Sequence, residues 1–469
     1  MDPSTVHPEL QALADHWATT HHIPTLTWGV MLDGQVELSG HSGQLDDGST
    51  PTARTVFRIA SMTKPFTAAT VLRLRDDGVL TLDDPVPDLP IGPTSDGPPI
   101  TLRHLLSMQS GLTADDPWAD RHLDVARAEL DAILAARPRF AVPPATAFEY
   151  SNLGFAVIGR VVERHTGKRL QDLVGELLLQ PLGLQRTTWL RPRHDDWARP
   201  YRVEDDASVP DDAPLGDGAL APMGGLWSTV EDLGRVMAFF DDAFPPRDGG
   251  DDGPLRRSSR RELQQVQRAG GVSRTLASGE GLDHVPERVD AAGYGFGMQI
   301  VHDQRFGDIV GHSGGLPGYG SNMRWLPGRR VGAVALANVT YAPMRLLTRR
   351  MLEVLDDHGF VPPVAIVANP ALRSIGAALV ALVNDWDDGV ADELFADNVA
   401  PDESLERRAR AARAVIAAHG PLTLERIDAA LDTDATAIAR ASDGHEVHLW
   451  FALSPLRHAR IQEYTITAH

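Results

Sequence analysis

Residues 57–65 read Phe-Arg-Ile-Ala-Ser-Met-Thr-Lys-Pro, and the interpretation of the whole chain starts from this stretch. An apolar pattern with helical spacing follows it, and Gly78 ends that pattern. Pro65 falls in the first turn of the predicted helix, where its missing N–H costs little. Because side chains three positions apart share one face of a helix, we expect the Ser61 hydroxyl to lie within reach of the Lys64 amine.

The spacing of this serine and this lysine is specific in view of the composition. The chain has 21 serines but only two lysines, Lys64 and Lys168, so about 0.1 occurrences of Ser-x-x-Lys are expected by chance. A serine beside an amine at a helix N-terminus is suited to nucleophilic attack, because the helix end favours developing negative charge. The alternative is a helix-capping serine followed by an exposed lysine.

A second motif, Tyr150-Ser151-Asn152, precedes an apolar helix predicted for residues 153–162. A tyrosine at this place can act as a base only if nearby cations lower its pKa well below the usual value of about 10. Lys64 is the candidate cation. The alternative is a core tyrosine followed by a helix-capping asparagine.

A third motif, His-Ser-Gly-Gly at residues 312–315, ends a predicted strand at 309–312. A glycine-flanked strand can lie against a substrate, so Gly315 is predicted to complete an oxyanion hole with the N–H of Ser61. A second copy of the pattern at residues 41–43 follows an early hairpin, and we interpret it as a surface turn. The predicted substrate-binding residues are Asn152, His312, Ser313, Gly314 and Gly315.

Strand patterns occur early and late in the chain, with helical patterns between them. Residues 26–38 form a predicted hairpin that turns at Asp33-Gly34, and β-type runs return between residues 295 and 338. This order implies one sheet assembled from both ends of a domain. We therefore expect an α/β sandwich, an antiparallel sheet flanked by helices, with an all-helical lobe at about residues 80–290.

The domain boundaries follow from a proline-rich stretch late in the chain. Residues 1–360 are predicted to form the main domain and residues 361–370 a linker, because prolines end the preceding helix and stiffen the junction. Residues 371–469 read as two helices followed by antiparallel strands, which predicts a small α+β accessory domain.

The three motifs resemble those of the serine β-lactamase, penicillin-binding-protein and D-aminopeptidase family, specifically its class C-like branch. The resemblance extends over about residues 8–358, with the motifs in the family's order. It implies a β-lactamase/transpeptidase-like fold, Ser61 as nucleophile, Lys64 and Tyr150 as the proton-transfer pair and Asn152 as a substrate-orienting residue. Supporting stretches are 102–107, 110–112, 225–229, 232–233 and 294–297.

His312 departs from the pattern of this family, because β-lactamases and transpeptidases usually carry a lysine at that position. A histidine near its ordinary pKa of about 6.5 is mostly neutral at pH 7, so it binds a substrate carboxylate less strongly. In this respect the chain resembles the family VIII carboxylesterases and D-aminopeptidases. Hydrolysis of carboxylic esters or small amides and peptides is therefore favoured, and the alternatives are β-lactamase or DD-peptidase activity and a non-catalytic sensor or binding protein.

Residues 311–315 also fit the Gly-x-Ser-x-Gly nucleophile elbow of α/β-hydrolases. That elbow must lead into a helix, whereas residues 316–320, Leu-Pro-Gly-Tyr-Gly, break one. This interpretation would make Ser313 rather than Ser61 the nucleophile.

Composition excludes several other classes of function. A net charge of −20 with scattered basic residues argues against nucleic acid. The chain has no cysteine and no paired motif such as His-Glu-x-x-His, so we expect no metal and no other cofactor.

The N-terminus lacks a signal-peptide pattern, and the longest apolar run, residues 375–383, is about half the length needed to cross a bilayer. We therefore expect a cytoplasmic enzyme with no membrane partner. Its expected partner is a small-molecule ester, amide or peptide substrate, and the small domain is a candidate for homo-oligomer formation.

Overall fold

The computed structural model describes residues 2–86, 98–192, 196–211, 216–247, 249–364, 370–429 and 431–469. The described residues form two compact units. The first extends to Val364, and the second comprises the described residues from Pro370 to the end. Half of the predicted linker at 361–370, residues 365–369, lies outside the described residues.

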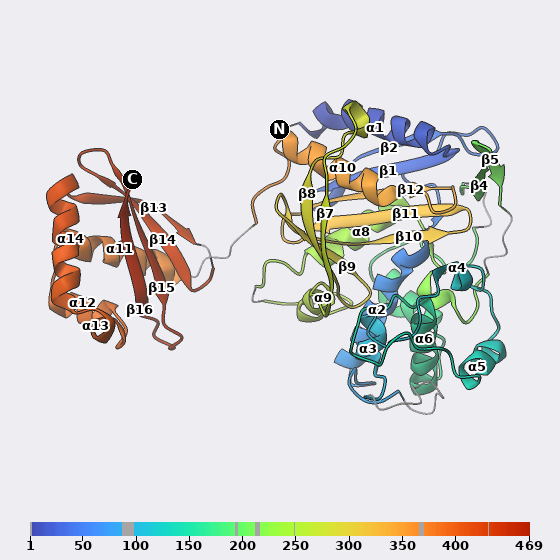
Figure 1. The fold of residues 1–469 in the computed structure, drawn as a ribbon, viewed down its shortest axis with the longest axis horizontal. Helices are drawn as coiled ribbons and strands as arrows, with labels where there is room; N and C mark the ends of the chain where they lie inside the picture. Colours follow the sequence, from blue (N-terminus) through green and yellow to red (C-terminus); the bar gives the residue numbers. More distant parts are fainter. Residues whose placement is uncertain are drawn as a thin grey trace. The chain divides into compact units, whose positions relative to one another are not determined.

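An antiparallel sheet of eight strands forms the centre of the first unit, in the order β2-β1-β12-β11-β10-β9-β8-β7 (Figure 1). The early hairpin pairs directly with the late strand β12, with Trp28 opposite Ala335, so both ends of the unit contribute to one sheet as predicted. The strands are β1 (Thr25–Leu32), β2 (Gln35–Gly43), β7 (Arg268–Thr275), β8 (Arg288–Tyr294), β9 (Gln299–Asp303), β10 (Gly307–Leu316), β11 (Tyr319–Leu326) and β12 (Val331–Ala337).

Helices cover both faces of the central strands. On one face Trp28 and Val30 of β1 pack in a core with α1 (His7–Thr20) and α10 (Met344–Asp357), which lie together along the sheet in Figure 1. On the opposite face Val334 and Leu336 of β12 belong to the larger core, which includes α8 (Val230–Asp241). Because both faces are covered, every residue of β1 and β12 is buried.

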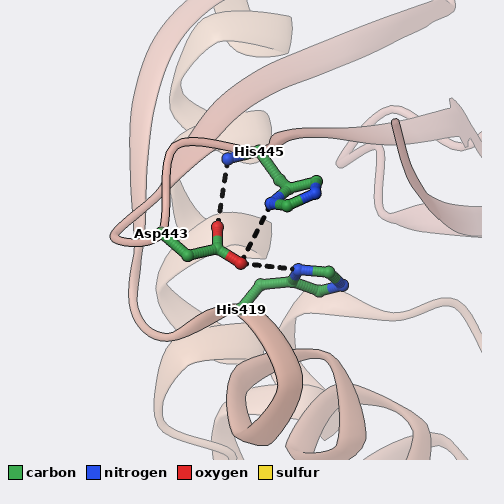
Figure 2. A group of neighbouring side chains, drawn as sticks. All are labelled: His419, Asp443 and His445. Atoms are coloured by element: carbon green, nitrogen blue, oxygen red, sulfur yellow. Dashed lines mark hydrogen bonds and ion pairs between the residues drawn. The ribbon is translucent and has the colours of Figure 1, made fainter.

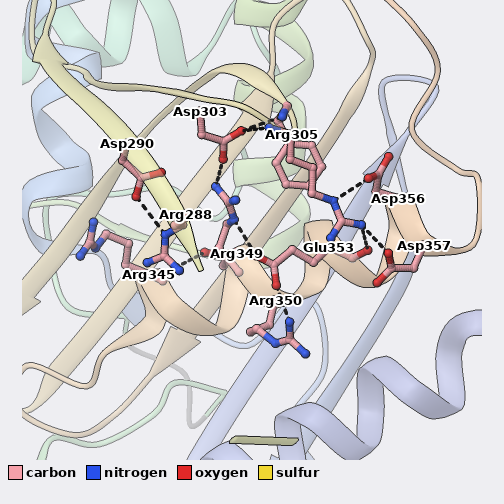
Figure 3. Close-up of polar contacts among 12 residues, drawn as sticks. Arg288, Asp290, Asp303, Arg305, Arg345, Arg349, Arg350, Glu353, Asp356 and Asp357 are labelled. Atoms are coloured by element: carbon pink, nitrogen blue, oxygen red, sulfur yellow. Dashed lines mark hydrogen bonds and ion pairs between the residues drawn. The ribbon is translucent and has the colours of Figure 1, made fainter. Parts of the chain in front are cut away.

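Ion pairs at its C-terminal half attach α10 to the sheet, as Figure 3 shows. Arg349 donates from Nε to Glu353 at 2.9 Å and also pairs with Asp303 at the end of β9. Arg350 pairs with the other oxygen of Glu353, and Arg305 binds Asp356 at 2.6 Å. Since Asp303 and Glu353 are almost completely buried, their arginine partners offset the cost of removing these carboxylates from water.

A helical lobe lies between β2 and β7 in the sequence. Its elements are α2 (Lys64–Asp76), α3 (Leu102–Leu106), α4 (Asp116–Ala119), α5 (Arg127–Ala135), α6 (Asn152–Thr166), α7 (Leu170–Val174), α8, α9 (Arg257–Leu263), the 3-10 turns η2 (Ala60–Thr63) and η4 (Ala221–Met223), and the π turn η3 (Gly175–Leu179). Short strand pairs join it, namely β3 (Phe57–Arg58) with β6 (Trp227–Ser228) and β4 (Tyr201–Glu204) with β5 (Ala207–Pro210).

The range predicted as a helical lobe, residues 80–290, also contains strands of the sheet. Strand β7 lies at the open edge and β8 next to it, and both were missed from the sequence. Every residue of β7 is at least partly exposed. An exposed edge strand has no buried face, so it lacks the alternation of apolar side chains on which strand prediction depends.

The second unit is a small α+β fold, with a four-stranded antiparallel sheet in the order β13-β14-β15-β16. Side chains of β15 alternate between buried and partly exposed, and the buried Leu449 and Phe451 pack in one core with Leu379 and Val383. Its elements are α11 (Pro370–Asn384), α12 (Asp388–Leu394), α13 (Val399–Asp402), α14 (Leu405–His419), β13 (Leu422–Ala429), β14 (Asp434–Ala441), β15 (Glu446–Leu453) and β16 (Ile461–Ala468). The sheet covered on one face confirms the predicted class of this part of the chain.

A hydrogen-bonded cluster ties the end of α14 to the turn between β14 and β15 (Figure 2). One oxygen of Asp443 accepts from His419 at 2.9 Å and from His445 at 3.0 Å. The backbone N–H of His445, followed by these two side-chain contacts, lowers the pKa of Asp443 to about 2. These contacts therefore hold the end of α14 against the turn between β14 and β15.

A search of the described helices found none with both the length and the apolar character required to span a bilayer.

Candidate active site

Ser61 lies in the η2 turn that leads into α2, at the junction of the sheet and the helical lobe. The preceding residue, Ala60, has a φ of 50°, a left-handed conformation that is strained for a residue with a side chain. Strand β10 passes directly beside the turn, because a Cβ atom on Gly314 would lie 2.2 Å from the carbonyl oxygen of Ile59. The third motif is therefore adjacent to the first.

Lys64 is completely buried, and its amine contacts three acceptors. Nζ lies 2.8 Å from Ser61 Oγ, 2.7 Å from Asn152 Oδ1 and 2.8 Å from the carbonyl oxygen of Met223. The last two oxygens can only accept hydrogen bonds. When Lys64 loses a proton, its two remaining N–H groups can serve these oxygens, and the lone pair then faces the Ser61 hydroxyl.

Burial makes that loss of a proton accessible near neutral pH. It lowers the pKa of Lys64 to about 8, against the opposing influence of the nearby carboxylates Asp116, Asp120 and Asp115. A buried lysine that is neutral in part at physiological pH can act as a general base.

Tyr150 stands beside this pair, with its ring centroid 4.8 Å from Lys64 Nζ. The condition for Tyr150 to act as a base, a pKa lowered by nearby cations, is not met. Burial, followed by the negative charge of Asp116, raises the pKa of Tyr150 well above its ordinary value, although the hydrogen bond with Ser61 acts in the opposite direction. The phenol is therefore protonated in the free protein and is placed to donate a proton rather than to accept one.

Asn152 begins α6, and two aspartates of the α4 segment set its orientation. Asp115 accepts from the backbone N–H of Asn152 at 2.7 Å and of Leu153 at 2.8 Å, so it caps the helix. Asp116 accepts from Asn152 Nδ2 at 2.5 Å, which leaves Oδ1 facing Lys64. Sequence reasoning missed both aspartates, although Asp-Asp-Pro is a recognisable helix start.

His312 is a predicted substrate-binding residue that does not line the cavity described below. Its Nδ1 lies 2.6 Å from the carbonyl oxygen of Ser313, so this nitrogen carries the proton and donates. Its Nε2 then accepts from the hydroxyl of Tyr294 at 2.9 Å. Burial and the charge of Lys64 lower the pKa of His312 to about 3, so the ring is neutral.

A cavity of about 480 Å³ opens over Ser61. Tyr150, Ser313, Gly314 and Gly315 line it together with Ser61, while Lys64 and Asn152 are completely buried beside it. Sequence reasoning missed the further lining residues, which are Asp116, Asp120, Phe148, Gln299, Ser321, Tyr341, Ala342, Pro343, Met344 and Arg345.

Two of the lining residues, Asp120 and Arg345, carry ionisable side chains of opposite type. Asp120 accepts a hydrogen bond from the Tyr341 hydroxyl at 2.9 Å, and burial raises its pKa to about 7. Arg345 lies in the first turn of α10 and is exposed.

Comparison with known proteins places most of this chain in a family. The family described as Beta-lactamase matches residues 10–356, which is most of the first unit. The chain belongs to the beta-lactamase family. Within this family of serine hydrolases, the antiparallel sheet with flanking helices is the shared fold, and the predicted resemblance and fold class are confirmed.

Relatives in the beta-lactamase family differ in their named activities. The chain is 29% identical over 326 residues to the D-alanyl-D-alanine-carboxypeptidase/endopeptidase AmpH of Escherichia coli K12, covering 67% of this chain and 79% of that protein. It is 28% identical to the esterase EstB of Burkholderia gladioli, covering 62% of this chain and 79% of that protein. The octameric penicillin-binding protein homologue from Pyrococcus abyssi is similar in fold, with a TM-score of 0.63 at 17% identity over 98% of this chain and 99% of that one.

The alternative that Ser313 is the serine of a nucleophile elbow is inconsistent with its position. Ser313 lies within β10, paired with Asn322 of the neighbouring antiparallel strand β11, and the strand continues to Leu316. An elbow serine would be followed by a helix, whereas β10 turns back into β11.

Proposed function

We propose that this beta-lactamase-family enzyme hydrolyses carboxylic esters or small amides and peptides through an acyl-enzyme on Ser61. The observation that carries the proposal is the environment of Lys64. Its amine lies 2.8 Å from Ser61 Oγ, and its two other contacts are with oxygens that cannot donate. The neutral amine can then accept only the proton of Ser61.

In the first step neutral Lys64 takes the proton of Ser61 as Oγ attacks the carbonyl carbon of the substrate. The backbone N–H groups of Ser61 and Gly315 serve as the oxyanion hole for the negative charge that develops on the carbonyl oxygen. Tyr150, which is protonated, gives its proton to the leaving alcohol or amine and regains one from Lys64. Asn152 holds the lysine amine through Oδ1 and so acts on the reaction through Lys64 rather than by contact with the substrate.

In the second step a water molecule attacks the acyl group on Ser61. The proton of this water passes to neutral Lys64 through Tyr150, which gives its own proton to the amine as it takes the one from water. Lys64 then donates a proton to Ser61 Oγ as the bond between Oγ and the acyl carbon breaks. The side chains of the protein therefore transfer the protons themselves, and these two reaction steps need no cofactor.

The preference for esters and amides over β-lactams rests on His312. The ring is neutral, and Ser313 and Tyr294 occupy both of its nitrogens, so it offers no positive charge to a β-lactam carboxylate. The esterase EstB among the relatives supports an ester substrate. We assign the reaction to the hydrolase domain, residues 1–360, with residues 361–370 as linker and 371–469 as an accessory domain.

The deciding experiment is a substrate panel measured on the wild type and on Ser61→Ala. The panel contains p-nitrophenyl esters, D-amino-acid p-nitroanilides and nitrocefin. We expect ester or anilide turnover that vanishes in the variant, with little or no nitrocefin turnover. Efficient nitrocefin hydrolysis would contradict the role given to His312, and full activity of Ser61→Ala would contradict the mechanism.

A further inference from the structure

A second, smaller cavity of about 50 Å³ lies next to the catalytic one, between the sheet and α10. The two cavities share Gln299 and Arg345 in their linings. The smaller one is unusual for its charge, because four arginines line it: Arg288, Arg324, Arg345 and Arg349. Figure 3 shows three of them, on β8 and α10.

Two of these arginines are neutralised by carboxylates. Arg349 pairs with Asp303 and Glu353, and Arg288 donates from Nε to Asp290 at 2.9 Å. Asp290 is the one acid in the lining, and its other oxygen is buried without a partner among the described residues.

The other two arginines have no carboxylate partner among the described residues. Arg324 on β11 donates from Nε to the neutral Asn322 Oδ1 at 3.0 Å, and within the described ranges its guanidinium makes no other hydrogen bond. For the guanidinium of Arg345 the same part of the chain provides no acceptor. Burial, followed by the charges of Arg345, Arg349 and Arg288, lowers the pKa of Arg324 to about 9, against the opposing charge of Asp290.

Unpaired cations that line a cavity are stabilised when an anion enters it. The volume limits the ligand, because the cavity has room for only a few water molecules and therefore admits a small group. Guanidinium groups are planar and donate in pairs, which matches the oxygens of carboxylates and phosphates. We propose that this arginine-lined cavity binds a small oxyanion, a phosphate or a carboxylate group, between Arg324 and Arg345.

The proposal is independent of the reaction assigned to Ser61, and inorganic phosphate and sulfate are the probes that test it. Thermal unfolding of the full chain is followed while these salts replace sodium chloride at constant ionic strength. We expect a saturable rise in Tm of about 2–4 °C with either oxyanion and none with chloride. The Ser61→Ala variant must respond like the wild type.

Arg324→Gln removes one of the two unpaired cations and should weaken phosphate binding, measured by calorimetry, at least tenfold. Arg274→Gln is the matched control, because Arg274 is an exposed arginine on β7 that pairs with Glu287 outside the cavity. It loses the same charge and should bind phosphate like the wild type. If Arg324→Gln does not fold, Arg345→Gln at an exposed position gives the same test.

Equal effects of chloride and oxyanions, or undiminished phosphate binding by Arg324→Gln or Arg345→Gln, would overturn the proposal. A kinetic arm separates the two sources of the oxyanion. If the substrate supplies a carboxylate, phosphate raises the KM of p-nitrophenyl hydrogen succinate but not that of neutral p-nitrophenyl butyrate. If the oxyanion is a separate ligand, phosphate binds with the same affinity in the presence of either ester.

Discussion

Lys64 Nζ and Ser61 Oγ lie 2.8 Å apart, although the lysine has no exposed surface at all. A buried ammonium is costly, and this cost, which lowers the pKa of Lys64 to about 8, gives the serine a base at neutral pH. The same burial keeps the phenol of Tyr150 protonated. One physical cause thus divides the roles of base and acid between the two side chains.

The first prediction concerns the nucleophile. Ser61→Ala should lower kcat by about 10³-fold or more and abolish covalent labelling by a fluorophosphonate, detected by intact-protein mass spectrometry. Ser313→Ala, which alters a serine of the same cavity, should still be labelled at one site per chain. Labelling that persists in Ser61→Ala and disappears in Ser313→Ala would contradict this prediction, because it would place the acyl group on Ser313.

The pH dependence should report the lysine. Because the reactive form is neutral Lys64, kcat/KM should increase as the pH rises through an apparent pKa of about 8 and should be low at pH values below it. Lys64→Met should lower kcat by about 10²- to 10⁴-fold and remove this limb of the profile. Lys168→Met is the control, since the only other lysine is exposed and pairs with Glu176 at 2.7 Å. An unchanged profile in Lys64→Met would rule out the lysine as base.

Asp116→Asn should shift that profile to lower pH. The carboxylate of Asp116 stabilises the charged form of Lys64. Removal of this carboxylate therefore lowers the pKa of the lysine, so that the neutral amine forms at a lower pH. The pH profile of kcat/KM measures this shift, and Asp308→Asn, which alters an exposed aspartate paired with His302, should leave it in place. A shift toward higher pH would contradict the electrostatic role of Asp116.

The stability of the first unit should depend on Glu353. Glu353→Gln leaves the buried Arg349 with Asp303 alone and removes the carboxylate that binds Arg350, which should cost about 3 kcal/mol of unfolding free energy. Urea unfolding followed by tryptophan fluorescence measures the loss. Glu287→Gln breaks an exposed pair with Arg274 and should produce little change. A loss no larger than that of the control would show that the buried network contributes little.

Several elements of the fold were accessible from the sequence because their patterns are local. The hairpin turn at Asp33-Gly34 and the apolar spacing of α2 and α6 are read from neighbouring residues. Strands β7 and β8 were missed, because a strand at an exposed edge has no apolar alternation to detect. Asp115 and Asp116 were overlooked for a related reason, since their importance lies in what they contact on α6.

The sequence by itself determined that Ser61 and Lys64 share one helical turn, because residues three apart on a helix are neighbours in any fold. It also determined the family and the order of the three motifs. Only the tertiary structure decided the direction of the pKa shift of Tyr150 and the engagement of both nitrogens of His312. These properties depend on burial and on charges from distant segments, and neither quantity exists until the helical lobe packs against the sheet.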